Sequence, residues 1–132
     1  MVIGDEIVIS AIVDNDAFAM TGVENSIGTY ESMTVANDKV TSTVTTKFTL
    51  CEGYVDGTYA LKFGDSYLSY SGSSNKIYTD EKIEEVSSWN ISVSDGAAKI
   101  ESYKVSGRLL KYNKASGQER FCCYASGQVG LT

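Results

Sequence analysis

Short stretches of alternating apolar and polar residues, separated by glycine-containing turns, run along the whole chain. Residues 47–51 and 89–93 show this alternation clearly. A period of two is typical of strands that bury one face, and dipeptides such as Asp95-Gly96 favour tight turns because glycine readily adopts positive φ. The best helical candidate, residues 79–86, spans about two turns at most. The pattern therefore predicts an all-β chain of about ten to twelve short strands.

A pattern of about forty residues recurs three times. Residues 67–72 align with residues 109–113, and residues 17–22 fit the same frame. A later strand in each copy begins with a bulky apolar residue, and these positions lie about forty residues apart. The recurrence predicts a common inward position in each copy. The six predicted inward side chains are Phe18, Phe48, Leu68, Trp89, Leu110 and Leu131.

Three copies of about four strands predict a β-trefoil, in which six strands close a barrel and three hairpins cap one end. The 132 residues are predicted to form one domain, 1–132, with repeats at about 5–57, 58–97 and 98–132. The first copy is longer, so residues 23–45 are expected to hold an enlarged loop or a longer hairpin. Alternation and turns do not fix topology, and another small closed barrel or a β-sandwich is the alternative.

Composition excludes several kinds of chemistry. The chain has no histidine, which excludes Ser-His-Asp and Cys-His catalysis and any histidine-ligated metal. A domain of this size rarely builds the deep cleft of a glycosidase, so we expect no enzymatic activity and no cofactor. No apolar run reaches the length of a membrane span, and we expect no membrane partner.

The net charge of −6 makes a nucleic acid a less favoured partner, although basic residues gather in the last third. They are Lys99, Lys104, Arg108, Lys111, Lys114 and Arg120.

Two short motifs have a plain structural interpretation. The odd number of cysteines and the adjacency of Cys122 and Cys123 favour reduced thiols, with a single bridge from Cys51 to either as the alternative. Asp14-Asn15-Asp16 could offer oxygens to calcium, but it lacks the longer spacing of a calcium loop and is predicted to be a turn.

Several motifs, most of them in the second half, carry a family resemblance. They are Gly4 to Ile9, Tyr67-Leu68, residues 71–75, 87–91 and 95–100, Arg108 to Asn113, and Arg120 to Gln128.

On these motifs the chain resembles an accessory all-β module, trefoil-like, of secreted and surface proteins of gut anaerobic bacteria. That module occurs beside extracellular nucleases, glycan-degrading enzymes and adhesin-like repeats. The resemblance implies a non-catalytic domain of a larger secreted or cell-surface protein, and the abrupt ends of the chain favour an excised domain. It also implies that Cys123 points inward. Residues 23–45 match nothing in the family.

Tyrosines are the most promising ligand-binding feature, because exposed aromatic faces stack on sugar rings. Tyr70 and Tyr112 share one repeat position, and strand alternation leaves open that both belong to the core. Tyr54, Tyr78 and Tyr124 have no repeat partner and are expected at the surface. The candidate ligand-binding residues are Tyr70, Tyr112, Asn113, Arg120, Tyr124 and Gln128.

Two of the polar candidates also have a structural interpretation. Asn113 could bond within its turn, and Arg120 could pair with Glu119 or Glu101. Trp89 is expected in the core, because it leads a repeat strand. It follows Ser87-Ser88 rather than the Gln-x of the sugar-binding trefoil signature, which argues against the usual lectin sites of trefoils.

The sequence therefore predicts a monomeric carbohydrate-binding or adhesion module, with a polysaccharide or other glycan as its partner. A nucleic-acid-binding domain of a secreted nuclease and a structural or protein-interaction domain are the alternatives.

Overall fold

The protein is a chain of short antiparallel strands. A computed structural model describes all residues except 37–38, 42–46 and 129–131, and for 34–36 and 39–41 it describes the backbone alone. The described residues contain a single 3-10 turn, η1 (Glu85–Ser87), and no α-helix. The all-β prediction is confirmed, and the candidate helix at 79–86 is not formed, since a strand ends at Asp80.

The strands are β1 (Glu6–Ile7), β2 (Ser10–Val13), β3 (Asp16–Glu24), β4 (Ile27–Ala36), β5 (Lys39–Thr41), β6 (Phe48–Glu52), β7 (Tyr59–Phe63), β8 (Ser66–Ser69), β9 (Tyr78–Asp80), β10 (Trp89–Ser94), β11 (Ala97–Ser102), β12 (Arg108–Asn113) and β13 (Arg120–Ala125).

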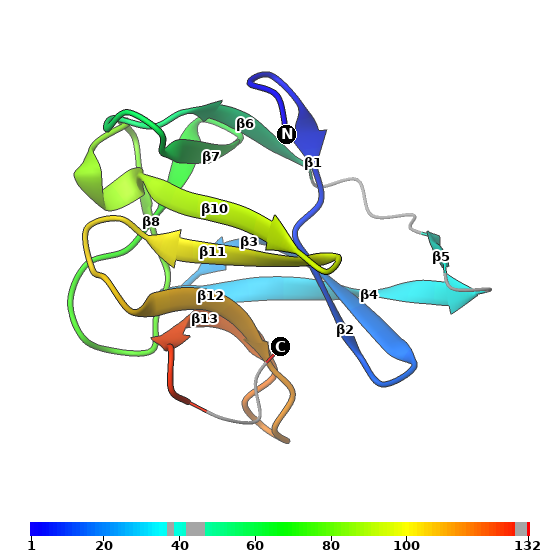
Figure 1. Ribbon diagram of the computed structural model, residues 1–132. Helices are drawn as coiled ribbons and strands as arrows, with labels where there is room; N and C mark the ends of the chain where they lie inside the picture. The colour runs from blue at the N-terminus through cyan, green and yellow to red at the C-terminus, as the bar shows by residue number, and fades with distance from the viewer. Residues whose placement is uncertain (37–38, 42–46, 129–131) are drawn as a thin grey trace.

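One antiparallel sheet runs through the molecule in the order β1-β6-β7-β10-β11-β12-β13-β4-β3-β2 (Figure 1). Strand β8 pairs with β7 and β9, and β5 pairs with β4. β11 pairs with β12 only at Glu101 and Leu109, so the rest of that edge has no partner among the described residues. Over the described part of the chain the sheet is therefore open.

Tight turns set the register of the hairpins. Asp95 and Gly96 both have positive φ, 53° and 77°, in the two-residue turn between β10 and β11. Asn25 and Ser26, with φ of 52° and 61°, do the same between β3 and β4. These are the angles of hairpin turns that match the twist of the strands. Asp14, with φ of 56°, begins the turn from β2 to β3, so the turn interpretation of this acidic motif is confirmed.

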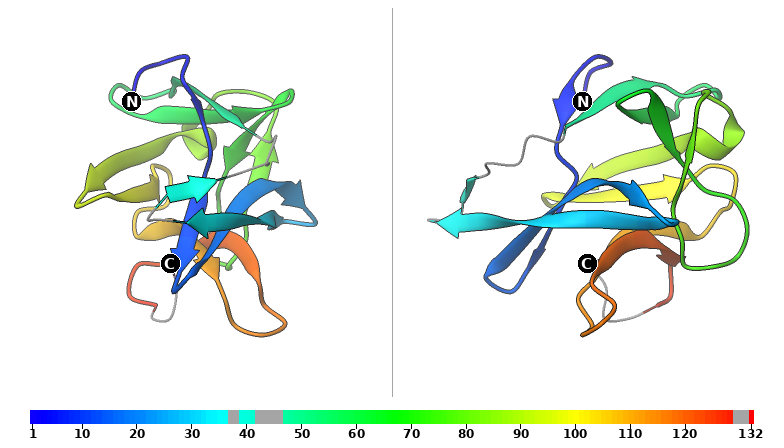
Figure 2. Two further views of the ribbon diagram at one scale, coloured as in Figure 1. Left: turned by 90° about the vertical axis from the view of Figure 1, so that its right-hand side faces the viewer. Right: turned by 180° about the vertical axis from the view of Figure 1, so that it is seen from behind.

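The first hairpin is much longer than its counterparts. β3 and β4 contain nine and ten residues, whereas β8 and β9 contain four and three. The far end of β4, with β5, projects from the body of the molecule (Figure 2). The prediction of a longer hairpin after residue 23 is confirmed as far as the described residues extend.

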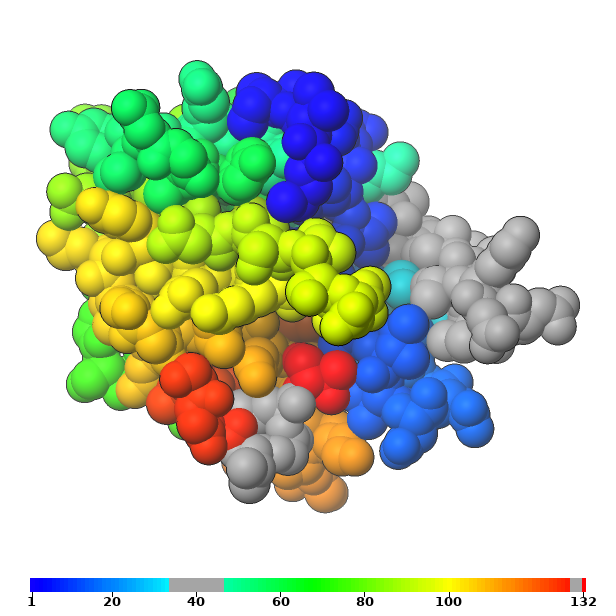
Figure 3. Space-filling model, viewed as in Figure 1, coloured from blue at the N-terminus to red at the C-terminus, as the bar shows by residue number. Residues whose placement is uncertain are grey.

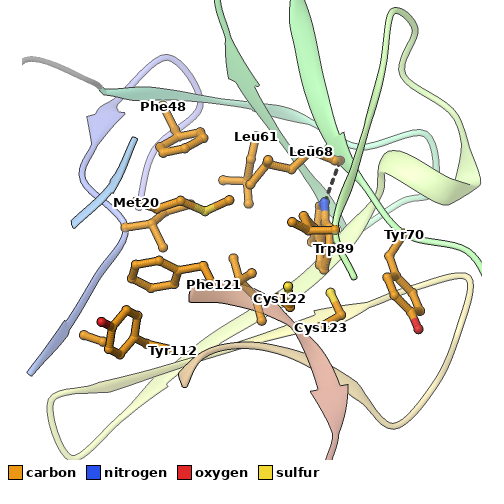
Figure 4. Close-up of a cluster of buried hydrophobic side chains, with 14 of the residues drawn as sticks. Met20, Phe48, Leu61, Leu68, Tyr70, Trp89, Tyr112, Phe121, Cys122 and Cys123 are labelled. Carbon is orange, nitrogen blue, oxygen red and sulfur yellow. Dashed lines mark hydrogen bonds between the residues drawn. The ribbon is translucent and has the colours of Figure 1, made fainter. Parts of the chain in front are cut away.

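The core gathers bulky side chains from separate parts of the chain (Figure 4). Phe48, Leu68, Trp89 and Leu110 are buried, as predicted from the repeat. The indole Nε1 of Trp89 donates to the carbonyl oxygen of Leu68 at 3.0 Å, which satisfies its only polar atom. Phe18 is half-buried against the core, and Leu131 lies outside the described residues.

Three hairpins, β3–β4, β8–β9 and β12–β13, meet at one side of this core. Strand β13 of the third hairpin pairs with β4 of the first through Phe121 and Gly28. The amide of Ile77 donates to the carbonyl of Ser26 at 3.1 Å, and the amide of Cys123 donates to that of Lys76 at 3.0 Å. A Cβ on Gly28 would lie 2.5 Å from the carbonyl oxygen of Phe121, so only glycine fits at this contact.

The three cysteines are free, as predicted, and no disulfide joins Cys51 to Cys122 or Cys123. Cys122 and Cys123 are buried, and burial raises the pKa of both thiols. A thiolate is disfavoured in such surroundings, so these residues serve as small apolar side chains.

Candidate functional site

The three tyrosines of the predicted ligand site are core residues. Tyr70, Tyr112 and Tyr124 are all buried, so none offers a ring face to a ligand, and the expectation that Tyr124 lies at the surface is wrong. Tyr112 stacks on Phe18 with ring centroids 4.6 Å apart. Burial is the main cause that raises the pKa of all three phenols, to about 12 for Tyr112. Tyr124 is buried because both faces of β13 are covered, which strand alternation alone does not predict.

Of the three polar residues of that predicted site, Asn113 and Arg120 support turns. Asn113 and Arg120 are cross-strand neighbours, and the Asn113 side chain accepts a hydrogen bond from the Ala115 amide at 2.9 Å. The Arg120 side chain donates to the carbonyl of Gln118 at 3.2 Å. Within the described residues it forms no ion pair, so the suggested pair with Glu119 or Glu101 is not formed. Gln128 is exposed, beyond the end of β13.

The basic residues of the last third are mostly engaged with partners. Lys99, Lys104 and Lys114 each contact a carboxylate, on Glu101, Glu85 and Asp14 respectively. Arg108 donates to the side chain of Asn75 at 2.8 Å and lies over the ring of Tyr70. These two contacts attach Arg108 to the loop after β8. These contacts leave little concentrated positive charge for a phosphate backbone.

A different cluster combines an exposed aromatic ring with charged groups. Tyr54, in the connection from β6 to β7, has 66% of its surface exposed. It lines a shallow pocket of about 370 Å³. The other lining residues are Glu84, Glu85, Val86 and Lys104. They come from η1 and from the connection between β11 and β12, at the end of the sheet on the left of Figure 1.

Buried serines tie the walls of this pocket together. The Tyr54 amide donates to Ser88 Oγ at 3.0 Å, and Ser88 Oγ donates to the Glu84 carbonyl at 2.7 Å. The Glu84 amide in turn donates to Ser87 Oγ at 2.8 Å. Ser87 and Ser88 are both buried. The backbone beneath Tyr54 and Glu84 is therefore fixed by hydrogen bonds.

The charges of this pocket are unbalanced. Lys104 Nζ lies 2.9 Å from Glu85 Oε2, and this hydrogen bond raises the pKa of the lysine. Glu84 is exposed and faces the carboxyl group of Asp80 instead. A hydrogen bond to Asp80, followed by its negative charge, raises the pKa of Glu84. The pocket thus contains two glutamates and one lysine, and that lysine is already paired with Glu85.

Sequence reasoning identified Tyr54 only as a surface tyrosine without a repeat partner. Its neighbours in the pocket lie 30 or more positions further along the chain. The pairing of Trp89 with both Tyr59 and Ser102 is what brings the three connections together. No local motif records that pairing, so the cluster could not be found from the sequence.

A second cavity has a different character. An apolar groove of about 520 Å³ lies between the β10–β11 hairpin and the segment from β1 to β2. Figure 3 shows a hollow below the tip of that hairpin. Aliphatic side chains such as Ile7, Ile12 and Ile100 dominate its described lining, which contains no charged side chain. It is poorly suited to a polar ligand.

The chain matches no protein-family model, no curated protein and no solved structure. Among the described residues, no group of three or more acidic or cysteine side chains could hold a metal ion. No helix in the described part of the chain is long and apolar enough to cross a membrane.

Proposed function

We propose that the protein is a non-catalytic carbohydrate-binding module and that the Tyr54 pocket is its glycan site. The observation that carries this proposal is the exposed ring of Tyr54 beside Glu84, Glu85 and Lys104 in one shallow pocket. An exposed aromatic face binds the apolar face of a pyranose ring, and nearby charged groups bind its hydroxyls.

Each side chain has a role in this proposal. The Tyr54 ring stacks against the sugar, while Val86 adds apolar surface beneath it. Carboxylate oxygens of Glu84 and Glu85 accept hydrogen bonds from sugar hydroxyls, and Lys104 donates one. Because the backbone is held by Ser87 and Ser88, little ordering is needed on binding.

The alternatives have weaker support. A nucleic acid would need clustered free cations, whereas most basic residues of the last third contact carboxylates or the loop after β8. A structural or protein-interaction role would leave the exposed aromatic pocket without a purpose. We propose, on the chain's resemblance to an accessory module, that it belongs to a larger secreted or cell-surface protein of a gut anaerobe. We also propose that the domain is a monomer.

We also propose that the fold is a β-trefoil. The three hairpins that meet at one side, the long-range pairs β1–β6 and β7–β10, and the repeated core positions Tyr70 and Tyr112 all support it. The edges of β11 and β1 that have no partner among the described residues flank the apolar groove, where a closing strand would belong in a trefoil.

Affinity electrophoresis in gels containing plant, host or microbial polysaccharides tests the glycan proposal. The wild-type protein should be retarded by at least one of them. Tyr54→Ala should bind about tenfold more weakly, because the stacking face is lost, and Tyr54→Phe should retain most of the affinity. Circular dichroism would check that both variants fold. Equal retardation of wild type and Tyr54→Ala, or none on any polysaccharide, would contradict the proposal.

A further inference from the structure

The charge arrangement of the Tyr54 pocket distinguishes between classes of glycan. Of its lining residues, two are glutamates and one is a lysine. The lysine ammonium is already 2.9 Å from a Glu85 oxygen, so an incoming carboxylate or sulfate would have to compete with that contact. The chain as a whole carries −6, which adds to the repulsion of anionic glycans.

Glu84 is the group left for a cation. It is exposed, it lines the pocket, and no lysine or arginine of the described residues forms an ion pair with it. The charged groups around it are Asp80 at the end of β9, Lys82, and the Glu85–Lys104 pair. Asp80 adds a second carboxyl group within hydrogen-bond reach of Glu84.

We propose that the preferred ligand of this pocket is an amino sugar with a free, protonated amine. The proposal rests on the glycan-binding function of the same pocket and names its ligand class. The sugar ring stacks on Tyr54, and the ammonium group donates to the Glu84 carboxylate. An ammonium placed near the tyrosine ring also gains from the negative face of the ring.

The N-acetylated form of the same sugar is neutral and loses the charged contact, but it can still stack. An ammonium near Glu84 favours the ionised carboxylate, so affinity should rise with pH as Glu84 loses its proton and fall again at higher pH as the sugar amine loses its own proton. The hydrogen bond to Asp80 and its charge raise the pKa of Glu84, which moves this rise above the range of an ordinary glutamate.

Isothermal titration calorimetry at low ionic strength tests the ligand class. The probes are a short, fully deacetylated chitosan oligosaccharide, its fully N-acetylated counterpart, and an oligogalacturonate of the same length. The wild-type protein should prefer them in that order. Glu84→Gln should weaken binding of the deacetylated probe about threefold and leave the N-acetylated probe unchanged.

A matched control separates the pocket from bulk charge. Glu81→Gln removes one negative charge from an exposed residue that does not line the pocket, and it should leave both affinities unchanged. Equal weakening by Glu84→Gln and Glu81→Gln would overturn the proposal.

Two further outcomes separate this proposal from the glycan function. Binding of the N-acetylated probe as tightly as the deacetylated one, with loss in Tyr54→Ala, would overturn the amino-sugar proposal and leave the glycan function intact. If Tyr54→Ala had no effect on any probe that binds, or no probe or polysaccharide bound at all, both would fall.

Discussion

Gly28 is the residue where the packing of the hairpins allows least change. A Cβ at this position would lie within 3 Å of the Phe121 backbone, the Phe121 side chain and Met20. The backbone oxygen cannot move aside without disturbing the pairing of β13 with β4. Gly28→Ala should therefore destabilise the protein by about 1–3 kcal/mol, as overpacking typically does. Gly127→Ala is the control, because a Cβ there would meet nothing within 4 Å. Urea denaturation of both variants would check this, and equal midpoints would contradict it.

Residue-level inference from the sequence succeeded where a side chain repeats with the strand period. Trp89, Phe48 and Leu68 follow the repeat and are buried as predicted. The prediction failed at Tyr124, which is buried because residues distant in the sequence cover the second face of β13 as well. Tyr54 is the converse case, since only the folded chain shows which charged groups lie beside it.

At the scale of elements, the connections rather than the strands form the candidate site. Ser88 is the residue that links two of them, since its hydroxyl accepts from the Tyr54 amide and donates to the Glu84 carbonyl. Ser88→Ala removes both hydrogen bonds at a buried position and should cost about 1–3 kcal/mol of stability. Because the loop carrying Tyr54 then loses its anchor, glycan affinity should fall as well. Ser94→Ala, at the exposed end of β10, is the control for stability and binding. Thermal unfolding with calorimetric titration would measure both effects, and an unchanged melting temperature would contradict the prediction.

The alternation of residues predicted most strands, and the dipeptide Asp95-Gly96 predicted its hairpin, because both depend on local geometry. The turn at Asn25 and Ser26 carries no glycine, so its positive φ values were not signalled. The length of the β3–β4 hairpin, in contrast, was predicted, because the first copy of the repeat contains more residues than the others.

At the scale of the whole molecule, the open path of the described sheet and the proposed trefoil make different predictions for β11. Glu101 pairs across to Leu109, but the rest of the edge from Ala97 to Ile100 faces the apolar groove. In a trefoil a further strand lies along this edge, and the alternate β11 amides that point away from β10 are hydrogen-bonded. Their hydrogen exchange, followed by NMR, should then be as slow as that of the amides between β10 and β11. Amides in the exposed turn at Asp95 and Gly96 are the fast reference. Exchange along the Ala97–Ile100 edge at the rate of that turn would mean that the edge is free, and the trefoil proposal would fail while the all-β fold would stand.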